Sequence, residues 1–131
     1  LQVIGAAGIK SEPVDQVSEN LVKIERFIAE HYKESLSIEV MAGMLNLSES
    51  RFKSWFKHQF GVPPLEFILR KRIEEAKKIL QSERCLNMSD IAYDLGFSSP
   101  QHFATMFKRY TFLSPKEYKA SFLAVSHSPA L

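Results

Sequence analysis

The sequence predicts an all-α fold of about seven helices, and three observations support this prediction. Large apolar residues recur three and four positions apart along most of the chain, which is the spacing of one face of a helix. No segment alternates apolar and polar residues over several positions, as a half-buried strand would. Serine, asparagine, glycine and proline stand where the apolar stretches begin or end, and these residue types favour helix boundaries.

The N-terminal part is expected to contain a linker and two helices. Residues 1–17 are small, contain glycine and are broken by proline, which is typical of a linker or tail. Apolar residues at helical spacing then run from Ser18 to Tyr32. Ser37 is a suitable N-cap for a short helix. Asn46 is a suitable stop for that helix, because asparagine tolerates the left-handed backbone of a tight turn.

Two longer helices are expected in the middle of the chain. Ser48 can cap a helix over residues 49–60, and Gly61 ends it. The proline pair at 63–64 starts a long helix that runs to about residue 81, because proline suits the first turn of a helix. Its apolar stripe indicates that one side of this helix is buried.

The C-terminal part repeats the pattern of a short helix followed by a longer one. The short helix is expected over residues 87–95, and Gly96 turns the chain after it. A longer helix is expected over 100–110 and a last short helix over 115–122. The residues from 124 onward are expected to form a loose tail.

An internal repeat connects the two halves of the chain. With a displacement of 50 positions, residues 37–38 fall on 87–88 and Ala42 falls on Ala92. The second copy then gains one residue, and a displacement of 51 matches Phe52 with Phe103, Phe56 with Phe107 and Pro64 with Pro115. Each copy consists of a short helix, a tight turn and a longer helix, which is the pattern of a helix-turn-helix motif.

The longer helices of the two copies keep their apolar residues, and this apolar stripe has the spacing of a buried face. We therefore expect its side chains in the core rather than as platforms for stacking bases. The residues concerned are Phe52, Trp55, Phe56, Phe60, Phe103, Met106, Phe107 and Tyr110.

The polar residues of the same helices differ between the copies. Ser50, Lys53, Ser54 and Lys57 form the polar face of the first helix, and Gln101, Ala104, Thr105 and Lys108 form the polar face of the second. The second helix has no carboxylate up to residue 109, and its glutamine and threonine are donors and acceptors of a size that fits base edges. The alternative for each helix is an ordinary solvated face.

The charge of the chain is unevenly distributed. Residues 1–50 carry 4 basic and 8 acidic side chains, residues 51–78 carry 8 and 3, and residues 79–131 carry 5 and 4, so the balances are −4, +5 and +1 and sum to +2. The basic charge therefore begins within the first of the two polar helices. In the long middle helix, Arg70, Lys71 and Arg72 are followed by Glu74 and Glu75, and ion pairing within the helix is as good an interpretation as DNA contact.

Several classes of site are not expected. One cysteine, Cys85, allows neither an internal disulfide nor a multi-cysteine zinc site, and we expect no cofactor or metal. No nucleophile stands with a base, and no glycine loop is built to hold phosphate, so we expect no enzyme. No apolar run approaches the roughly 18 residues of a membrane span. The chain begins with Leu1, without a basic leader, and a fragment of a longer intracellular protein is expected.

Two stretches resemble the DNA-binding domain of the AraC/XylS-type bacterial transcription regulators. They are IAYDLGFSSPQHFATMFKRY followed by SPKEY, and FGVPPLEFILRKRIEEAKKIL, and the similarity runs from Leu21 to Phe122. The resemblance implies two helix-turn-helix subdomains joined by a long helix, each placing its second helix in the major groove of promoter DNA. It departs from the family's usual glycine at Phe112 and at Asn46, and Phe112 must either avoid the left-handed conformation or accept a cost of about 1 kcal/mol or more.

The resemblance also implies an organisation and a cellular role. The expected organisation is a linker or tail of an upstream domain (1–17), a first helix-turn-helix subdomain (18–62), a connecting helix (63–82), a second helix-turn-helix subdomain (83–123) and a flexible tail (124–131). The expected role is that of an activator in the bacterial cytoplasm, associated with the nucleoid, which contacts RNA polymerase. This fragment is expected to be monomeric, and the full-length protein to dimerise through the upstream domain.

The resemblance assigns DNA contacts by position. The candidates for base contacts are Ser50, Arg51, Lys53, Ser54, Gln101, His102 and Thr105. The candidates for phosphate contacts are Ser37, Lys57, Asn87, Lys108 and Arg109. Gln101 suits adenine and Arg51 suits guanine, because each side chain can form two hydrogen bonds to the corresponding base. Because the two polar faces differ, the expected DNA site is asymmetric.

Two other functions remain as alternatives at this point. One is a helical protein-interaction module that keeps the fold without contacting bases. The other is the DNA-binding part of an alkyl-transferring enzyme, which would need Cys85 as its nucleophile.

Overall fold

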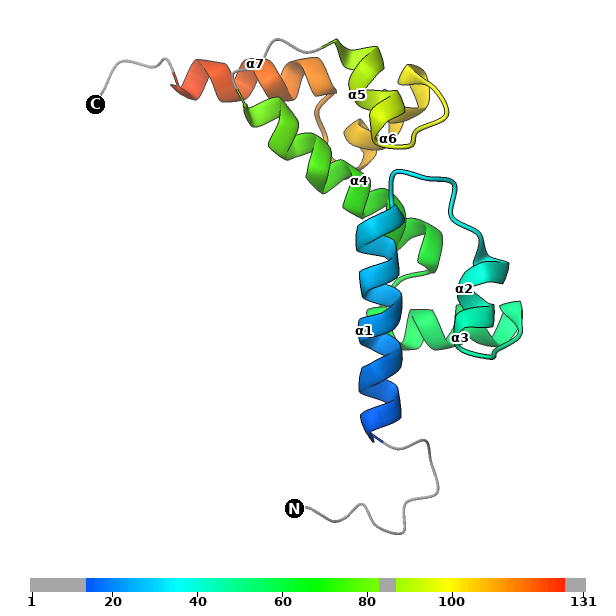
Figure 1. Cartoon of the computed structure of the whole chain (residues 1–131). Helices are drawn as coiled ribbons and strands as arrows, with labels where there is room; N and C mark the ends of the chain where they lie inside the picture. Colours follow the sequence, from blue (N-terminus) through cyan, green and yellow to red (C-terminus); the bar gives the residue numbers. More distant parts are fainter. Residues whose placement is uncertain (1–13, 83–86, 127–131) are drawn as a thin grey trace.

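The computed structural model describes residues 14–82 and 87–126, and these residues form an arrangement of α-helices without a strand. The helices are α1 (Val14–His31), α2 (Ile38–Met44), α3 (Glu49–Phe60), α4 (Pro64–Gln81), α5 (Met88–Asp94), α6 (Pro100–Thr111) and α7 (Pro115–Ser126). The predicted all-α class is confirmed. In Figure 1, α4 runs diagonally from the unit that contains α1, α2 and α3 to the unit that contains α5, α6 and α7.

Each unit has a hydrophobic core of its own. The first core contains Ile24, Ile28, Met41, Ala42, Phe52, Phe56 and Ile68. The second contains Ile73, Ala76, Leu80, Ile91, Ala92, Leu95, Phe97, Phe103 and Phe107. All eight residues of the predicted apolar stripe belong to these cores or pack against them. Helix α4 contributes to both cores, and Tyr32 packs against both.

Side chains that precede the helices satisfy their first backbone N–H groups. The N–H of Val40 donates to Ser37 Oγ (3.2 Å), and the N–H of Arg51 donates to Ser48 Oγ (3.2 Å). The predicted N-caps Ser37 and Ser48 are thereby confirmed. Such a cap stabilises a helix by about 1 kcal/mol.

Left-handed backbone ends the helices of the repeat. Asn46 (φ 58°) and Gly96 (φ 93°) occupy the two tight turns, as their residue types predict. Gly61 (φ 84°) and Phe112 (φ 69°) occupy equivalent C-caps, and the N–H of each donates to a carbonyl four residues earlier (2.8 Å). Phe112 therefore adopts the left-handed conformation itself, with 83% of its surface exposed.

Two helix boundaries differ from the sequence prediction. Residues 14–17, expected in the linker, form the first turn of α1. Val14 and Val17 extend the apolar spacing of Leu21 and Ile24 into this turn, and the Gln16 amide also donates to Asn20 Oδ1 one turn later (3.0 Å). Residues 124–126, expected in the tail, continue α7, because no glycine or proline interrupts the chain before Pro129. Residues 1–13, Cys85 and residues 127–131 lie outside the described part of the chain.

Candidate nucleic-acid interface

The polar face of α3 lies open to solvent. Ser50, Lys53, Ser54 and Lys57 are all exposed, and so is the neighbouring Arg51. The opposite side of the helix carries the aromatic side chains of the first core, so the helix has one fixed side and one free side. Between residues 50 and 60 this helix has no carboxylate, and its free side is therefore cationic and rich in hydrogen-bond donors.

The polar face of α6 is open at three of its four positions. Gln101, Thr105 and Lys108 are exposed, whereas Ala104 is half-buried. Arg109, next to this face, is exposed as well. Gln101 and Thr105 are four residues apart and so project from the same side of the helix.

His102 is held at the start of α6 rather than fully exposed. Its Nδ1 lies 3.4 Å from Ser98 Oγ, and its ring stands edge-on to Phe97 with the centroids 5.5 Å apart. Its backbone N–H donates to Ser99 Oγ (3.0 Å), which caps the helix. The half-buried imidazole therefore leaves only part of its edge for a ligand.

Two of the predicted phosphate contacts are capping residues. Ser37 Oγ accepts from the N–H of Val40, and Asn87 Oδ1 accepts from the N–H of Ser89 (2.7 Å). These side-chain oxygens are thus engaged within the protein.

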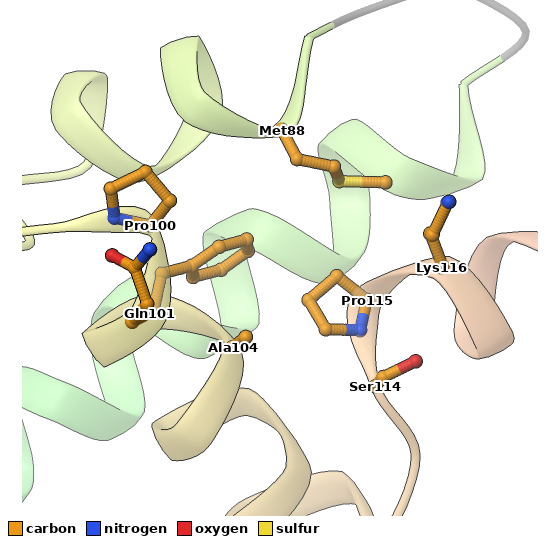
Figure 2. Close-up of a pocket in the computed structure, with 8 residues that line it drawn as sticks. Met88, Pro100, Gln101, Ala104, Ser114, Pro115 and Lys116 are labelled. Atoms are coloured by element: carbon orange, nitrogen blue, oxygen red, sulfur yellow. The ribbon is translucent and has the colours of Figure 1, made fainter.

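A groove borders each polar face. In the second unit it lies between α6 and the start of α7 (Figure 2), with Pro100, Gln101 and Ala104 on the α6 side and Ser114, Pro115 and Lys116 facing them. The equivalent groove of the first unit is lined by Ile38, Lys53, Ser54, Lys57, Pro63, Pro64 and Leu65. The sequence analysis did not predict these grooves, although Pro64 and Pro115, which line them, occupy matching positions in the repeat.

The connecting helix carries its own network of ion pairs. They join Arg70 to Glu66, Lys71 to Glu75 (3.3 Å), Lys77 to Glu74 (3.1 Å) and Lys78 to Glu75 (3.1 Å). Hydrogen bonds from Lys78 and Lys71 hold the pKa of Glu75 below its usual value. Pairing within the helix therefore describes Arg70 and Lys71. The interpretation as an ion pair within the helix is wrong for Arg72, which is buried and donates to backbone carbonyls of the segment after α1.

Comparisons with known proteins agree with this architecture. A family model described as a helix-turn-helix domain matches residues 41–121. The chain is 34% identical over 100 residues to LumQ of Photobacterium leiognathi, described as a probable transcriptional regulator, and the match covers 76% of this chain and 40% of LumQ. It is 27% identical to RhaS of Escherichia coli, described as a transcriptional activator, over 82% of this chain and 38% of RhaS. The chain thus spans about 40% of the length of these relatives.

Solved structures share the fold. The C-terminal domain of the response regulator yesN from Fusobacterium nucleatum is 32% identical, with a TM-score of 0.71, and the match covers 77% of this chain and 98% of that domain. The DNA-binding domain of the transcriptional factor AdpA, solved with a target DNA, is 24% identical, with a TM-score of 0.73 and coverages of 87% and 98%. Within the described residues, no helix combines the length and the apolar character needed to cross a bilayer.

Proposed function

Because the chain belongs to the AraC/XylS-type family of helix-turn-helix transcription regulators, we propose that it binds double-stranded promoter DNA in a sequence-specific manner through α3 and α6. The observation that supports this most directly is the pair of exposed polar faces on equivalent helices. Both faces lack carboxylates, and each helix is fixed by aromatic residues to a separate core. A helix held in this way can enter the major groove without losing its own packing.

The proposed contacts divide into base contacts and phosphate contacts. Ser50, Arg51, Lys53 and Ser54 on α3, and Gln101 and Thr105 on α6, are proposed to contact bases, with His102 at the edge of the α6 contact. Lys57, Lys108 and Arg109 lie further along their helices and are proposed to contact phosphates, since phosphate contacts position a protein on the duplex. Near Ser37 and Asn87, whose side chains cap helices, the proposed phosphate donors are backbone N–H groups.

The length of α4 supports contact with two neighbouring major grooves. Its 18 residues span about 27 Å at 1.5 Å per residue, and the two units extend beyond its ends. Successive major grooves on one side of DNA lie about 34 Å apart. One chain is therefore proposed to contact both grooves, and any mismatch is taken up by bending the DNA at a cost of about 1–6 kcal/mol.

The proposed partners follow from the family. The activity is proposed to be activation of transcription through contact with RNA polymerase, because relatives such as RhaS are described as activators. The protein is proposed to act in the bacterial cytoplasm at the nucleoid. This chain is proposed to bind as a monomer, while an upstream domain of the full-length protein would sense an effector and dimerise.

Selection from random duplexes tests the proposal. We expect a selected sequence to bind at least about 10³-fold more tightly than bulk DNA. Binding should also weaken linearly on a plot of log affinity against log salt concentration. A chain that enriches no sequence would refute the proposed specificity.

Substitution of the polar face of α6 separates base contact from a protein-interaction role. The double variant Gln101→Ala, Thr105→Ala should lose affinity for the selected duplex and keep its affinity for bulk DNA. Lys78→Ala serves as a control for substitution of an exposed residue outside α3 and α6, because Lys78 lies on α4. Unchanged affinity of the double variant for the selected duplex would favour a helical interaction module instead.

A further inference from the structure

Arg72 lies on α4 at the boundary between the two cores. Ile68, one turn before it, belongs to the first core, and Ile73, directly after it, belongs to the second. Arg72 is buried as a residue, with 8% of its surface exposed. Burial lowers the pKa of its guanidinium through desolvation. The arginine nevertheless stays charged at neutral pH, because its ordinary pKa lies far above 7.

The guanidinium joins α4 to the segment that follows α1. Its Nε donates to the carbonyl oxygen of Tyr32 (2.7 Å), and its Nη2 donates to the carbonyl oxygen of Glu34 (2.8 Å). Carbonyls at the C-terminal end of a helix lack partners within that helix and carry partial negative charge. Tyr32 directly follows the last residue of α1 and Glu34 lies two residues further on, so Arg72 satisfies carbonyls just beyond the end of α1 from a different helix.

The same group touches the turn of the second helix-turn-helix motif. Its Cζ lies 5.8 Å from the centre of the Phe97 ring. Gly96 leaves no room there: a Cβ at this position would lie 2.5 Å from the Lys33 carbonyl oxygen and 3.2 Å from Arg72 Cζ. Lys33 also forms an ion pair with Asp94 of α5 (Nζ to Oδ2, 3.7 Å). The segment after α1, the middle of α4 and the turn of the second motif therefore meet at one point.

We propose that Arg72, together with residues 32–34 and Gly96, forms an inter-unit clamp that fixes the angle between the two helix-turn-helix units and thereby selects the spacing of the two DNA half-sites. The effect on DNA rests on the proposed function, whereas the fixed angle is a property of the free protein. Arg72 acts here as a positioning residue and makes no contact with DNA itself.

A fixed angle has a defined consequence for binding. Linking two binding units raises affinity only when both can engage at once, and a stiff link satisfies this for a narrow range of separations. One added base pair rotates a half-site by about one tenth of a turn, since a helical turn takes about 10–10.5 base pairs. A clamped chain should thus discriminate sharply between spacings, and an unclamped chain should tolerate several.

Two variants loosen the clamp by independent routes. Arg72→Met keeps an unbranched side chain that ends near the position of Nε, and it removes both hydrogen bonds to the carbonyls. Gly96→Ala leaves α4 unchanged and forces a Cβ against the Lys33 carbonyl. Gly61→Ala is the matched control, because Gly61 has a similar positive φ (84°) but nothing within 4 Å of the added Cβ.

The first measurement uses no DNA. Spin labels are placed at Gly43→Cys and Tyr93→Cys, which are exposed and equivalent in the repeat, in a chain carrying Cys85→Ser. Circular dichroism confirms that each variant is folded before it is measured, and Arg72→Lys, which keeps the charge, replaces Arg72→Met if the latter is unfolded. We expect a narrow distribution of label distances for the parent and for Gly61→Ala, and a broadened or shifted one for both clamp variants. Identical distributions in all folded chains would overturn the proposal.

The second measurement uses the selected duplex with its half-sites moved by one and two base pairs. The parent should lose about tenfold or more in affinity when the spacing changes. The clamp variants should bind the best spacing about tenfold more weakly, show a flatter dependence on spacing, and bind a single half-site as the parent does. An unchanged spacing profile in both variants would refute the link to DNA. A parent that binds no DNA while its clamp variants change the label distances would refute the proposed function and leave the clamp standing.

Discussion

Replacing Phe112 with glycine should stabilise the folded chain by up to about 1 kcal/mol. Phe112 ends α6 in the left-handed conformation, with φ 69° and ψ 4°. Its counterpart in the first unit, Gly61, has φ 84° and ψ −12° and makes the same backbone hydrogen bond. The two positions therefore allow one backbone conformation to be compared with and without a side chain.

The magnitude follows from three contributions. Releasing an L-residue from the left-handed region gains about 1–2 kcal/mol. Glycine loses about 0.5 kcal/mol more backbone entropy on folding than a residue with a side chain. The side chain of Phe112 is 83% exposed, so its removal forfeits only about 0.3–0.5 kcal/mol of burial. The hydrogen bond to the Lys108 carbonyl is retained, because glycine keeps the N–H.

Urea unfolding measures the prediction. Far-UV circular dichroism reports both units, and fluorescence of Trp55, the single tryptophan, reports the first core. Gly61→Ala serves as the reverse experiment and should destabilise the chain by about 1 kcal/mol, because its Cβ meets no atom within 4 Å and only the backbone strain remains. A lower midpoint for Phe112→Gly at an unchanged slope would refute the reasoning and would mean that the aromatic side chain stabilises the cap.

Three further predictions concern the core, the pH dependence and DNA binding. Ala92→Leu should destabilise the second unit by about 1–3 kcal/mol in urea unfolding, because Ala92 is fully buried where α5 meets α6 and added methyl groups must displace its neighbours. The pKa of Glu75 is lowered in the folded chain, so its ion pairs stabilise the fold above the ordinary pKa of 4.5, and this contribution is lost as the pH falls through the lowered value. The difference in unfolding free energy between the parent and Glu75→Gln should therefore vanish at acid pH. A difference that stays constant with pH would count against this prediction. Lys108→Ala should weaken binding to all duplexes alike and reduce the slope of log affinity against log salt concentration by about 1, whereas Gln101→Ala should relax the preference at one base pair. Competition assays at several salt concentrations distinguish the two effects. The same pattern in both variants would contradict the proposal that Lys108 contacts phosphate and Gln101 contacts a base.

Local chemistry made most of the fold predictable from the sequence. Ser37 and Ser48 cap the helices expected of them, because an N-cap depends on a backbone N–H only three residues away. The repeat predicted equivalent core positions for Phe52 and Phe103, and at most 1% of the surface of either residue is exposed. Periodicity identifies such residues because the buried side of a helix is a property of its own sequence.

The features that depend on distant backbone were not predictable. From the sequence, Arg72 was expected to form an ion pair within its helix or to contact DNA. Its actual acceptors are backbone carbonyl groups 38 and 40 residues away, and every residue has such a group, so the sequence does not show which ones accept. His102 was expected to contact bases, and its contact with Phe97, which depends on how the turn folds back on the helix, was not foreseen. The proposed DNA contacts remain predictions, since they depend on a partner that the sequence does not contain.

The separation of the two cores from the two polar faces has a consequence for how such a chain changes over evolutionary time. A substitution at Gln101 or Thr105 alters no buried contact, and a substitution at Ser50 or Ser54 affects neither the second core nor its stability. Mutations of this kind are close to neutral for folding. Each unit can therefore acquire a different proposed DNA preference by substitution on its polar face, while the residues of both cores stay the same.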